Sequence, residues 1–489
     1  MKINLKKNNI LIFSIIFFLA ILLRIYYFLN LDSWFDEWNM MYTVNPFISN
    51  QETWERFFGD RGDHYLPEYY PPLNAFILKY FLLYTGYYAE NARIYSLLFG
   101  CSSVLLVYIL STLITKSKTN YIATFLFSIN LFVIWQSNEI RPHSFVLFFS
   151  LLNIILFINL IRKPLNIFFS TLYICLSVLL LSSWPFALTI YFGKSLYILI
   201  HYNLKKISLY KYFFIFLSIL VFYIFFNYDY LIYHLQRDSH YTILNLSFFY
   251  SFHFRSFFGS IFMGGVFLIL FSFFLLKDLK KNLRDENESN ILIYIIISSY
   301  FLTISYSILK AGVISPKYII FVLPLIIVWV SYKISLTKLK SKIIILLVIF
   351  NILNTFYFFF KNPIDRPPFN KVIKIISESK VLNVVTNEDL VTNNAFNNYK
   401  NFDKKKLILF DLQSENFIDK NHQFIDSKSD NLLVTEFWFV CLNNPRFAVG
   451  SSKLPIKEKC KIFENSKNYT EIKNIKIDDF ILKRYERNG

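Results

Sequence analysis

A series of apolar stretches, each close to the length of a membrane-spanning helix, constrains this chain more than any other feature. A helix that crosses the hydrocarbon core of a bilayer needs about 20 mostly apolar residues. Eleven stretches approach this length, at 10–29, 94–114, 119–136, 143–161, 167–183, 186–202, 210–228, 257–276, 291–309, 318–332 and 343–360. A soluble fold of 489 residues, 55% of them hydrophobic, could not bury so much apolar surface. The sequence therefore predicts a polytopic α-helical membrane protein with about eleven transmembrane helices.

The basic residues predict how these helices are oriented. Short loops rich in Lys and Arg stay on the cytoplasmic side of a membrane. Such clusters precede the first stretch and follow every second one, as Lys2/Lys6/Lys7, Lys116/Lys118, Arg162/Lys163, Lys205/Lys206/Lys211, Lys277/Lys280/Lys281/Arg284 and Lys333/Lys338/Lys340/Lys342. The formal charge of +18 thus reflects helix orientation, and no nucleic acid partner is expected. We expect a multi-pass protein of the cell (inner) membrane, with a cytoplasmic N-terminus and an uncleaved first helix.

The part of the chain after the last apolar stretch has a different pattern. Short β-rich runs at 381–385, 407–410 and 432–440 alternate there with polar segments. The last helix should carry the chain outward, so we expect a transmembrane domain at 1–362 and a small extracytoplasmic α/β domain at 363–489. Cys441 and Cys460 could form a disulfide in that oxidising compartment, and the sequence leaves this open.

The first outer loop, 30–92, begins with acidic and aromatic residues directly at the predicted membrane boundary. Asp36 and Glu37 stand between Trp34 and Trp38. A carboxylate at this depth is partly desolvated, which suits a general base, although the same residues also fit an ordinary aromatic belt. Further along the loop, residues 73–84 follow a diproline and are too few to span, so they predict a juxtamembrane helix on the outer surface.

Two other outer loops carry charges that a plain turn would not need. The second outer loop contains Glu139, Arg141 and His143 between two apolar stretches. A guanidinium binds phosphate through two parallel hydrogen bonds, but Arg141 could also pair with Glu139 and simply anchor the loop. Lys317 precedes a later helix on the outer side, where it either extends toward the interface or contacts a lipid phosphate.

In this order the segments resemble the GT-C superfamily of polyprenyl-phosphate-sugar-dependent glycosyltransferases. That superfamily includes protein O-mannosyltransferases, lipid A aminoarabinose transferases and the RgtA/B/C/D-like enzymes. The resemblance covers about residues 5–330, and it rests on Phe35-Asp36-Glu37, Tyr70-Pro71-Pro72-Leu73, Ala92-Arg93-Ile94-Tyr95-Ser96, Glu139-Ile140-Arg141-Pro142-His143-Ser144, and Lys317-Tyr318 with Pro324.

The resemblance implies a site and a reaction. An acid of the first outer loop is the expected catalytic base, which places this role on Asp36 with Glu37 beside it. The sugar is expected to pass with inversion from a polyprenyl-phosphate-linked donor to an extracytoplasmic glycolipid, polysaccharide or protein. The residues expected to bind the donor phosphate are Arg141, Lys317 and Arg93, and those expected to line the acceptor cavity are His64, Glu68, Glu139, His143 and Tyr318. No cofactor is certain, and a divalent metal ion is left open.

A transporter or permease for lipid-linked sugars or polysaccharides is the main alternative. Such a protein would place charged residues near the membrane midplane and would show internal repeats. The sequence has no evident repeat, and its acid and basic clusters lie at the outer boundary. A non-catalytic membrane scaffold would account for the helices but not for the loops, so the enzyme is the favoured interpretation.

Overall fold

The computed structural model describes most of the helical part of the chain and the central strands of its C-terminal part. The described residues are 7–58, 68, 70–115, 120–162, 166–201, 209–236, 253–280, 288–309, 315–360, 366–379, 381, 383–386, 408–411, 422–424, 435–443, 460–461, 463–464, 466 and 468–488. The helices before the sheet are α1 (Lys7–Asn30), α2 (Phe35–Thr43), α3 (Asn50–Phe58), α4 (Leu73–Thr85), α5 (Ala89–Thr115), α6 (Asn120–Ser128), α7 (Leu131–Gln136), α8 (His143–Arg162), α9 (Ile167–Leu181), the 3₁₀ turn η1 (Pro185–Ala187), α10 (Leu188–His201), α11 (Leu209–Phe226), α12 (Tyr228–Gln236), α13 (Arg255–Phe258), α14 (Ile261–Lys280), α15 (Ser289–Leu309), α16 (Val322–Ser335) and α17 (Lys340–Phe360).

Each of the eleven predicted stretches is largely helical, but fewer helices have full spanning length. Among the described residues, seven helices are long and apolar enough to cross a membrane, namely α1, α5, α8, α11, α14, α15 and α17. The stretch 119–136 divides into α6 and α7 because Asn130 begins a new helix, and its side chain accepts a hydrogen bond from the Val133 amide. The stretches at 167–183, 186–202 and 318–332 lie on the shorter helices α9, α10 and α16. The span count of eleven therefore stays a prediction.

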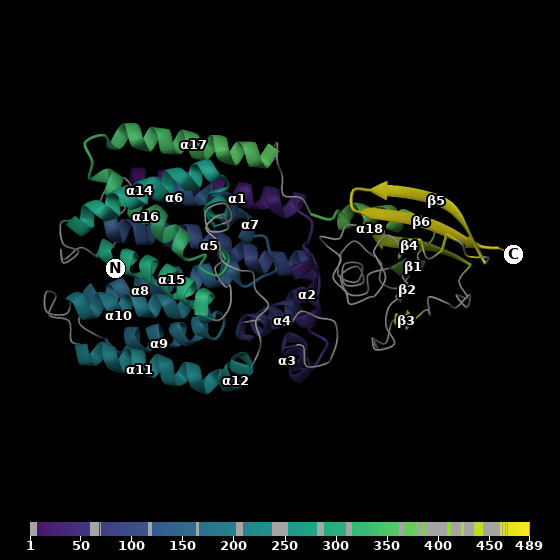
Figure 1. The fold of residues 1–489 in the computed structure, drawn as a ribbon, viewed down its shortest axis with the longest axis horizontal. Coiled ribbons are helices and arrows are strands. Elements are labelled where there is room, and N and C mark those ends of the chain that lie inside the picture. Colours follow the sequence, from purple (N-terminus) through teal and green to yellow (C-terminus); the bar gives the residue numbers. More distant parts are fainter. Residues whose placement is uncertain are drawn as a thin grey trace.

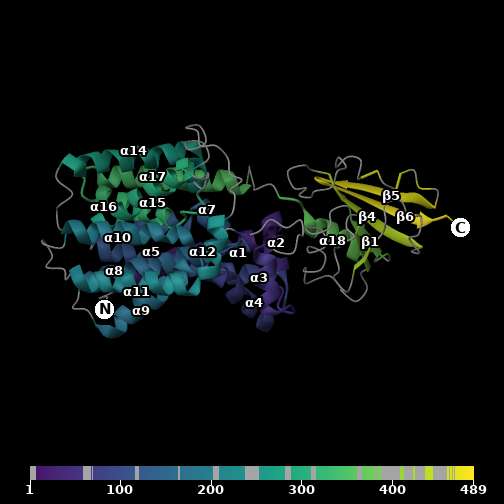
Figure 2. The same ribbon diagram turned by 60° about the horizontal axis from the view of Figure 1, so that its bottom comes forward.

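The long helices form a bundle, and the helices of the first loop lie at one of its ends (Figure 1). The end of α1 packs against the end of α17 there, with the rings of Tyr27 and Phe359 4.6 Å apart. The C-terminal sheet lies beyond this same end, and α18 stands between it and α2 (Figure 2). The described parts of the first and second predicted outer loops therefore lie at the end of the bundle that faces the sheet.

The helix α4 occupies the position of the predicted juxtamembrane helix. Its Lys79 is buried and donates to the carbonyls of Ile48 and Ser49 and to the side chains of Asn50 and Thr53. These contacts fix α4 to the start of α3 and satisfy the ammonium group, which a buried lysine requires. Its outward face exposes the apolar residues Tyr80, Leu83 and Tyr84, as expected for a helix lying on a membrane surface.

The C-terminal part is a six-stranded mixed sheet with α18 (Phe369–Ser377) before it. The strands are β1 (Asn383–Thr386), β2 (Ile408–Asp411), β3 (His422–Phe424), β4 (Glu436–Leu442), β5 (Tyr469–Ile477) and β6 (Phe480–Arg487), in the order β3-β2-β1-β4-β6-β5. Strands β1 to β4 pair in parallel, while β6 is antiparallel to β4 and β5. The three predicted β-rich runs overlap β1, β2 and β4. The ring of Phe369 packs between Phe480, 5.0 Å away, and Trp38, 5.8 Å away, so α18 joins the sheet to the first loop.

A disulfide joins Cys441 on β4 to Cys460, with 5.4 Å between their Cα atoms. Cys441→Ser is expected to lower the stability of the sheet by about 2–4 kcal/mol, because the bond restricts the unfolded chain. Pulse proteolysis of the full-length protein at increasing denaturant would measure this as earlier cleavage within 363–489. Equal protection of the variant and the unsubstituted protein would contradict the prediction.

Candidate active site

Glu37 joins the first outer loop to the second. It is the third residue of α2, and its Oε2 atom accepts a hydrogen bond from the Trp34 amide at 2.6 Å, as in a capping box. Its Oε1 atom accepts from the Ile140 amide at 2.9 Å, across 103 positions of sequence. The carboxylate is fully buried. The Glu37 carboxylate, which caps the start of α2, therefore lies where two loops that are far apart in sequence meet.

Buried arginines balance this carboxylate. Arg366 donates from Nη1 to Glu37 Oε2 at 2.6 Å and from Nη2 to Glu139 Oε1 at 3.0 Å. Arg93 lies on the other side, with its Nε 3.4 Å from Glu37 Oε1, and it also donates to the carbonyl of Leu31. Ionised groups are tolerated in a dry interior only when they are paired in this way. The charges of Glu37, Glu139, Arg93 and Arg366 thus form one buried network.

A second set of charges lies at the more exposed edge of this network. The Asp36 side chain is 37% exposed, and its Oδ2 lies 3.9 Å from Nη2 of Arg141. The Nη1 of Arg141 binds Glu68. The Lys317 side chain is 31% exposed, and its Nζ lies 3.8 Å from Oε2 of Glu139. Asp36 and Lys317 are therefore the two charged groups of the site that a substrate could reach most readily.

Burial and charge determine the protonation of the pair formed by Glu68 and Arg141. Burial raises the pKa of the Glu68 carboxyl, and the neighbouring Arg141 only partly offsets this effect. Burial lowers the pKa of the Arg141 guanidinium, but Glu68, Tyr70 and Asp36 outweigh it, so the pKa lies well above its usual value. Arg141 therefore stays charged, and its charge opposes the effect of burial on the Glu68 carboxyl.

An aromatic cluster centred on Trp184 forms one wall of the site. The Trp184 ring lies 5.1 Å from Tyr70, 5.4 Å from the imidazole of His143 and 5.8 Å from Tyr318. Its indole Nε1 donates to the Tyr318 carbonyl at 2.8 Å. Tyr318 also stacks on Phe186, with 4.9 Å between the centroids and 6° between the planes. This wall places His143 and Tyr318 close to Arg141 and Lys317.

The structure brings most of the sequence-predicted site residues together. A chain of contacts, which runs in part through Trp184 and Arg366, joins the residues Asp36, Glu37, Glu68, Arg93, Glu139, Arg141, His143, Lys317 and Tyr318. His64 lies outside the described residues. Arg366 is not among the site residues that the sequence predicted, although one signal was available. Arg366 follows the last apolar stretch on the predicted outer side, where a basic residue breaks the orientation trend as Lys317 does.

The described residues offer no ready set of metal ligands. No group of three or more His, Cys, Asp or Glu side chains within them is placed to hold a metal ion. The two acids at the edge of the site, Asp36 and Glu68, both face the Arg141 guanidinium. Within the described residues, the acids around Arg141 are therefore engaged by its guanidinium and do not form a set of metal ligands.

Fold and site together define a multi-helix protein with membrane-length apolar helices and a charged, partly exposed site at one end of its bundle. No family model matches the sequence, and no curated protein matches it either. The solved structures to which it is similar include several of the oligosaccharyltransferase of Archaeoglobus fulgidus.

Three of these structures span similar shares of the chain. The complex with zinc and sulfate has 12% identity and a TM-score of 0.43, and the match covers 76% of this chain and 60% of that one. The apo form has 11% identity, a TM-score of 0.46 and coverage of 77% and 62%. The form tethered to an acceptor peptide has 10% identity, a TM-score of 0.47 and coverage of 82% and 64%. At these values the likeness alone assigns this chain neither an activity nor a substrate.

Proposed function

We propose that this chain is a membrane-embedded glycosyltransferase that moves a sugar from a polyprenyl-phosphate-linked donor to an extracytoplasmic acceptor. The acceptor is a glycolipid, a polysaccharide or a protein. The reaction takes place in the transmembrane domain, 1–362, at its outer end, and residues 363–489 form an extracytoplasmic domain of the same cell-membrane protein.

The difference between Asp36 and its acidic neighbours is the observation that carries this proposal. Glu37 and Glu139 are buried and bind arginines, and Glu68 is buried against Arg141. Asp36 is the most exposed acid of the group, with 37% of its side chain exposed, and its Oδ2 lies 3.9 Å from Nη2 of Arg141. An acid with free acceptor capacity next to a cation suits the transfer of a sugar away from a phosphate.

The proposed reaction is a direct displacement with inversion at the anomeric carbon. The acceptor hydroxyl gives its proton to the Asp36 carboxylate while its oxygen bonds to the anomeric carbon. The bond from that carbon to the phosphate oxygen breaks, and the polyprenyl phosphate leaves with the electron pair. Arg141 and Lys317 stabilise the charge that develops on the leaving phosphate. Glu37 accepts hydrogen bonds from four donors and in this proposal keeps the two loops together.

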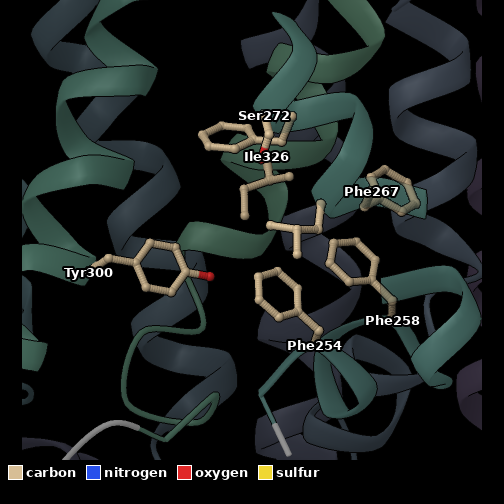
Figure 3. A pocket seen from close by; sticks show the side chains of 8 residues that line it. Phe254, Phe258, Phe267, Ser272, Tyr300 and Ile326 are labelled. Atoms are coloured by element: carbon tan, nitrogen blue, oxygen red, sulfur yellow. The ribbon is translucent and has the colours of Figure 1, made fainter. Parts of the chain in front are cut away.

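An apolar cavity within the helical bundle is suited to bind the lipid part of the donor. Figure 3 shows side chains from α13 to α16 that converge on it, with Tyr300 on one side and Phe267 on the other. Its volume is about 180 Å³, and it is lined by Phe254, Phe258, Phe267, Leu268, Phe271, Ser272, Tyr300 and Ile326. Protein interiors hold few voids larger than a water molecule, so a space of this size between apolar rings is suited to part of a hydrocarbon chain. Lys317 lies five residues before the start of α16 at Val322, the helix that carries Ile326.

Ser272→Phe is expected to weaken the use of long-chain polyprenyl donors, because the added ring fills the cavity. The measurement is kcat/KM with long-chain and short-chain lipid phosphate sugars, and only the long-chain value should fall. Ser272→Ala is the matched control, because it removes the hydroxyl without filling space. An equal fall in kcat/KM with the long-chain and the short-chain donor would show that the cavity does not bind the hydrocarbon chain.

Arg141→Lys is expected to raise the donor Kd about tenfold to a hundredfold. A lysine keeps the charge but loses the bidentate geometry, and one charge-assisted hydrogen bond contributes about 1.5–3 kcal/mol. Isothermal titration with a non-reactive lipid phosphate would measure the change. An unaltered Kd would remove Arg141 from the donor site.

The direct test of the proposed function is product formation. Purified protein in liposomes is incubated with a panel of polyprenyl-phosphate sugars and with glycolipid, polysaccharide and peptide acceptors, and the products are identified by mass spectrometry. A parallel reaction with a chelator, followed by addition of divalent ions, decides whether a metal assists. The proposal predicts an acceptor heavier by one sugar and a released lipid phosphate in equal amount.

A lysine buried within the helical bundle favours the alternative function, a transporter of lipid-linked sugars or polysaccharides. Lys194 on α10 is completely buried, where its ammonium binds Asn153 and the hydroxyl of Tyr173 and lies 5.0 Å from the centroid of the Phe157 ring. Intramembrane charges often mark transport pathways. Movement of intact labelled donor across a liposome membrane, without transfer to an acceptor, would favour this second function.

A further inference from the structure

We propose that Arg366 is a positioning residue of the active site, so that the segment after the last apolar helix completes the site. This inference rests on the proposed function, since it assigns Arg366 the role of holding the segment that carries Asp36. Arg366 is buried, and it affects the position of Asp36 through its hydrogen bonds to Glu37 and to the Asp32 carbonyl.

Arg366 connects three parts of the chain that are far apart in sequence. Its Nη1 atom donates to Glu37 Oε2 at 2.6 Å and to the Asp32 carbonyl at 2.7 Å. Its Nη2 atom donates to Glu139 Oε1 at 3.0 Å. The guanidinium therefore holds residues on both sides of Trp34 in the first loop and one acid of the second loop. Asp36 lies within this held segment, and its partner Arg141 lies two positions after Glu139.

The planar shape of the guanidinium explains why an arginine stands at this position. Its centre lies 6.0 Å from the ring centroid of Trp34 and 5.9 Å from that of Trp135. A guanidinium can contact aromatic rings through its faces while its edge donates several hydrogen bonds, and a lysine ammonium cannot do both. The side chain is only 1% exposed. The guanidinium is therefore held by three hydrogen bonds in buried surroundings that include two indole rings.

The start of α18 adds a second connection to the same segment. The backbone amide of Asn370, in the first turn of α18, donates to the Asp32 carboxylate at 2.9 Å. An acid at a helix N-terminus satisfies an amide that has no partner within the helix. Phe369 packs on Trp38 from the same turn. Residues 366–370 therefore contact α2 and the segment before it through an ion pair, a backbone hydrogen bond and an aromatic ring contact.

Removal of the Arg366 guanidinium would leave Glu37 and Glu139 close together without the cation between them. Like charges in a dry site repel strongly, so the two loops would separate and the distance from Asp36 to Arg141 would change. A displacement of about 1 Å in a catalytic group can lower a rate about 10²-fold. The effect should appear in kcat more than in KM, because donor contacts at Lys317 would remain.

The test compares Arg366→Ala, Arg366→Lys and the matched control Lys371→Ala. Lys371 lies in the same segment, but its side chain is 69% exposed and 3.8 Å from Asp478. We expect kcat to fall about 10²-fold in Arg366→Ala, to recover in part in Arg366→Lys or on addition of free guanidinium, and to stay unchanged in the control. Equal kcat values for Arg366→Ala and the unsubstituted enzyme would overturn the inference, as would a loss that guanidinium and lysine both fail to relieve in a folded protein.

A second measurement does not depend on activity. Asp36→Cys is introduced into a protein in which Cys101 and Cys175, the free cysteines of the described residues, are replaced by serine. Its labelling rate with a maleimide should change severalfold when Arg366→Ala is added and should not change with Lys371→Ala. If the unsubstituted enzyme transfers no sugar, the proposed function fails, and the labelling still decides whether Arg366 positions this segment. An identical labelling rate in the two backgrounds would refute the positioning role even in an active enzyme.

Discussion

Asp36→Asn is expected to lower kcat by about 10²–10⁴-fold, the usual contribution of a general base. The asparagine is nearly isosteric, but it cannot accept the proton of the acceptor hydroxyl. Because the Asp36 side chain is 37% exposed and its ion pair with Arg141 is as long as 3.9 Å, folding should be unaffected. The measurement is single-turnover transfer with saturating donor, together with the thermal unfolding midpoint in detergent.

Glu55→Gln is the matched control for this prediction. Glu55 is an acid of the same outer loop, but it lies on α3, where it binds Gln51. Its substitution should leave the rate unchanged. A purified Asp36→Asn enzyme with a near-normal rate would exclude Asp36 as the base, and the search for the base would then turn to other groups of the outer loops.

Glu37→Gln is expected to act mainly on stability and to destabilise the fold by about 3–5 kcal/mol, the typical effect of breaking a buried ion pair. Glutamine can still accept a hydrogen bond from the Ile140 amide, but Arg93 and Arg366 lose their shared counter-charge. Thermal unfolding of the purified protein would show a lower midpoint, and less protein should survive extraction in detergent. The neighbouring substitution Asp36→Asn should show neither effect.

A double-mutant cycle identifies the origin of this loss. If the unbalanced charge of Arg366 causes most of the destabilisation, Arg366→Met should cost much less stability in a Glu37→Gln background than alone. Additive losses for the two substitutions would show that the two side chains act independently. A Glu37→Gln protein as stable as the unsubstituted one would contradict the buried network itself.

Much of the fold was predictable because its causes are local. Apolar stretches of membrane length can be recognised from composition, and lipid covers their outer faces whatever their neighbours are. The eleven stretches are accordingly helical, and the predicted β-rich runs overlap β1, β2 and β4. The break at Asn130 was missed, since a single N-cap within an apolar run is a weak signal against continuous hydrophobicity.

The sequence predicted which types of residue lie near the candidate site at one end of the bundle, but it did not predict how these residues contact one another. The sequence indicated acids, arginines and a lysine in outer loops, and it offered Asp36 and Glu37 together for catalysis. Successive residues of a helix point about 100° apart, so adjacent acids on α2 cannot share one environment. Which of the two faces the interior depends on what packs against the helix.

What the chain's residues alone predicted is a polytopic helical membrane protein with charged loops between its helices, because the length and polarity of each segment are properties of that segment. Packing between distant segments decided the rest. It buried Glu37, left Asp36 exposed beside Arg141, and brought Arg366 to Glu37 across 329 positions. No local pattern encodes such a contact, because its energy depends on several helices ending at the same place and on the desolvation that their assembly produces.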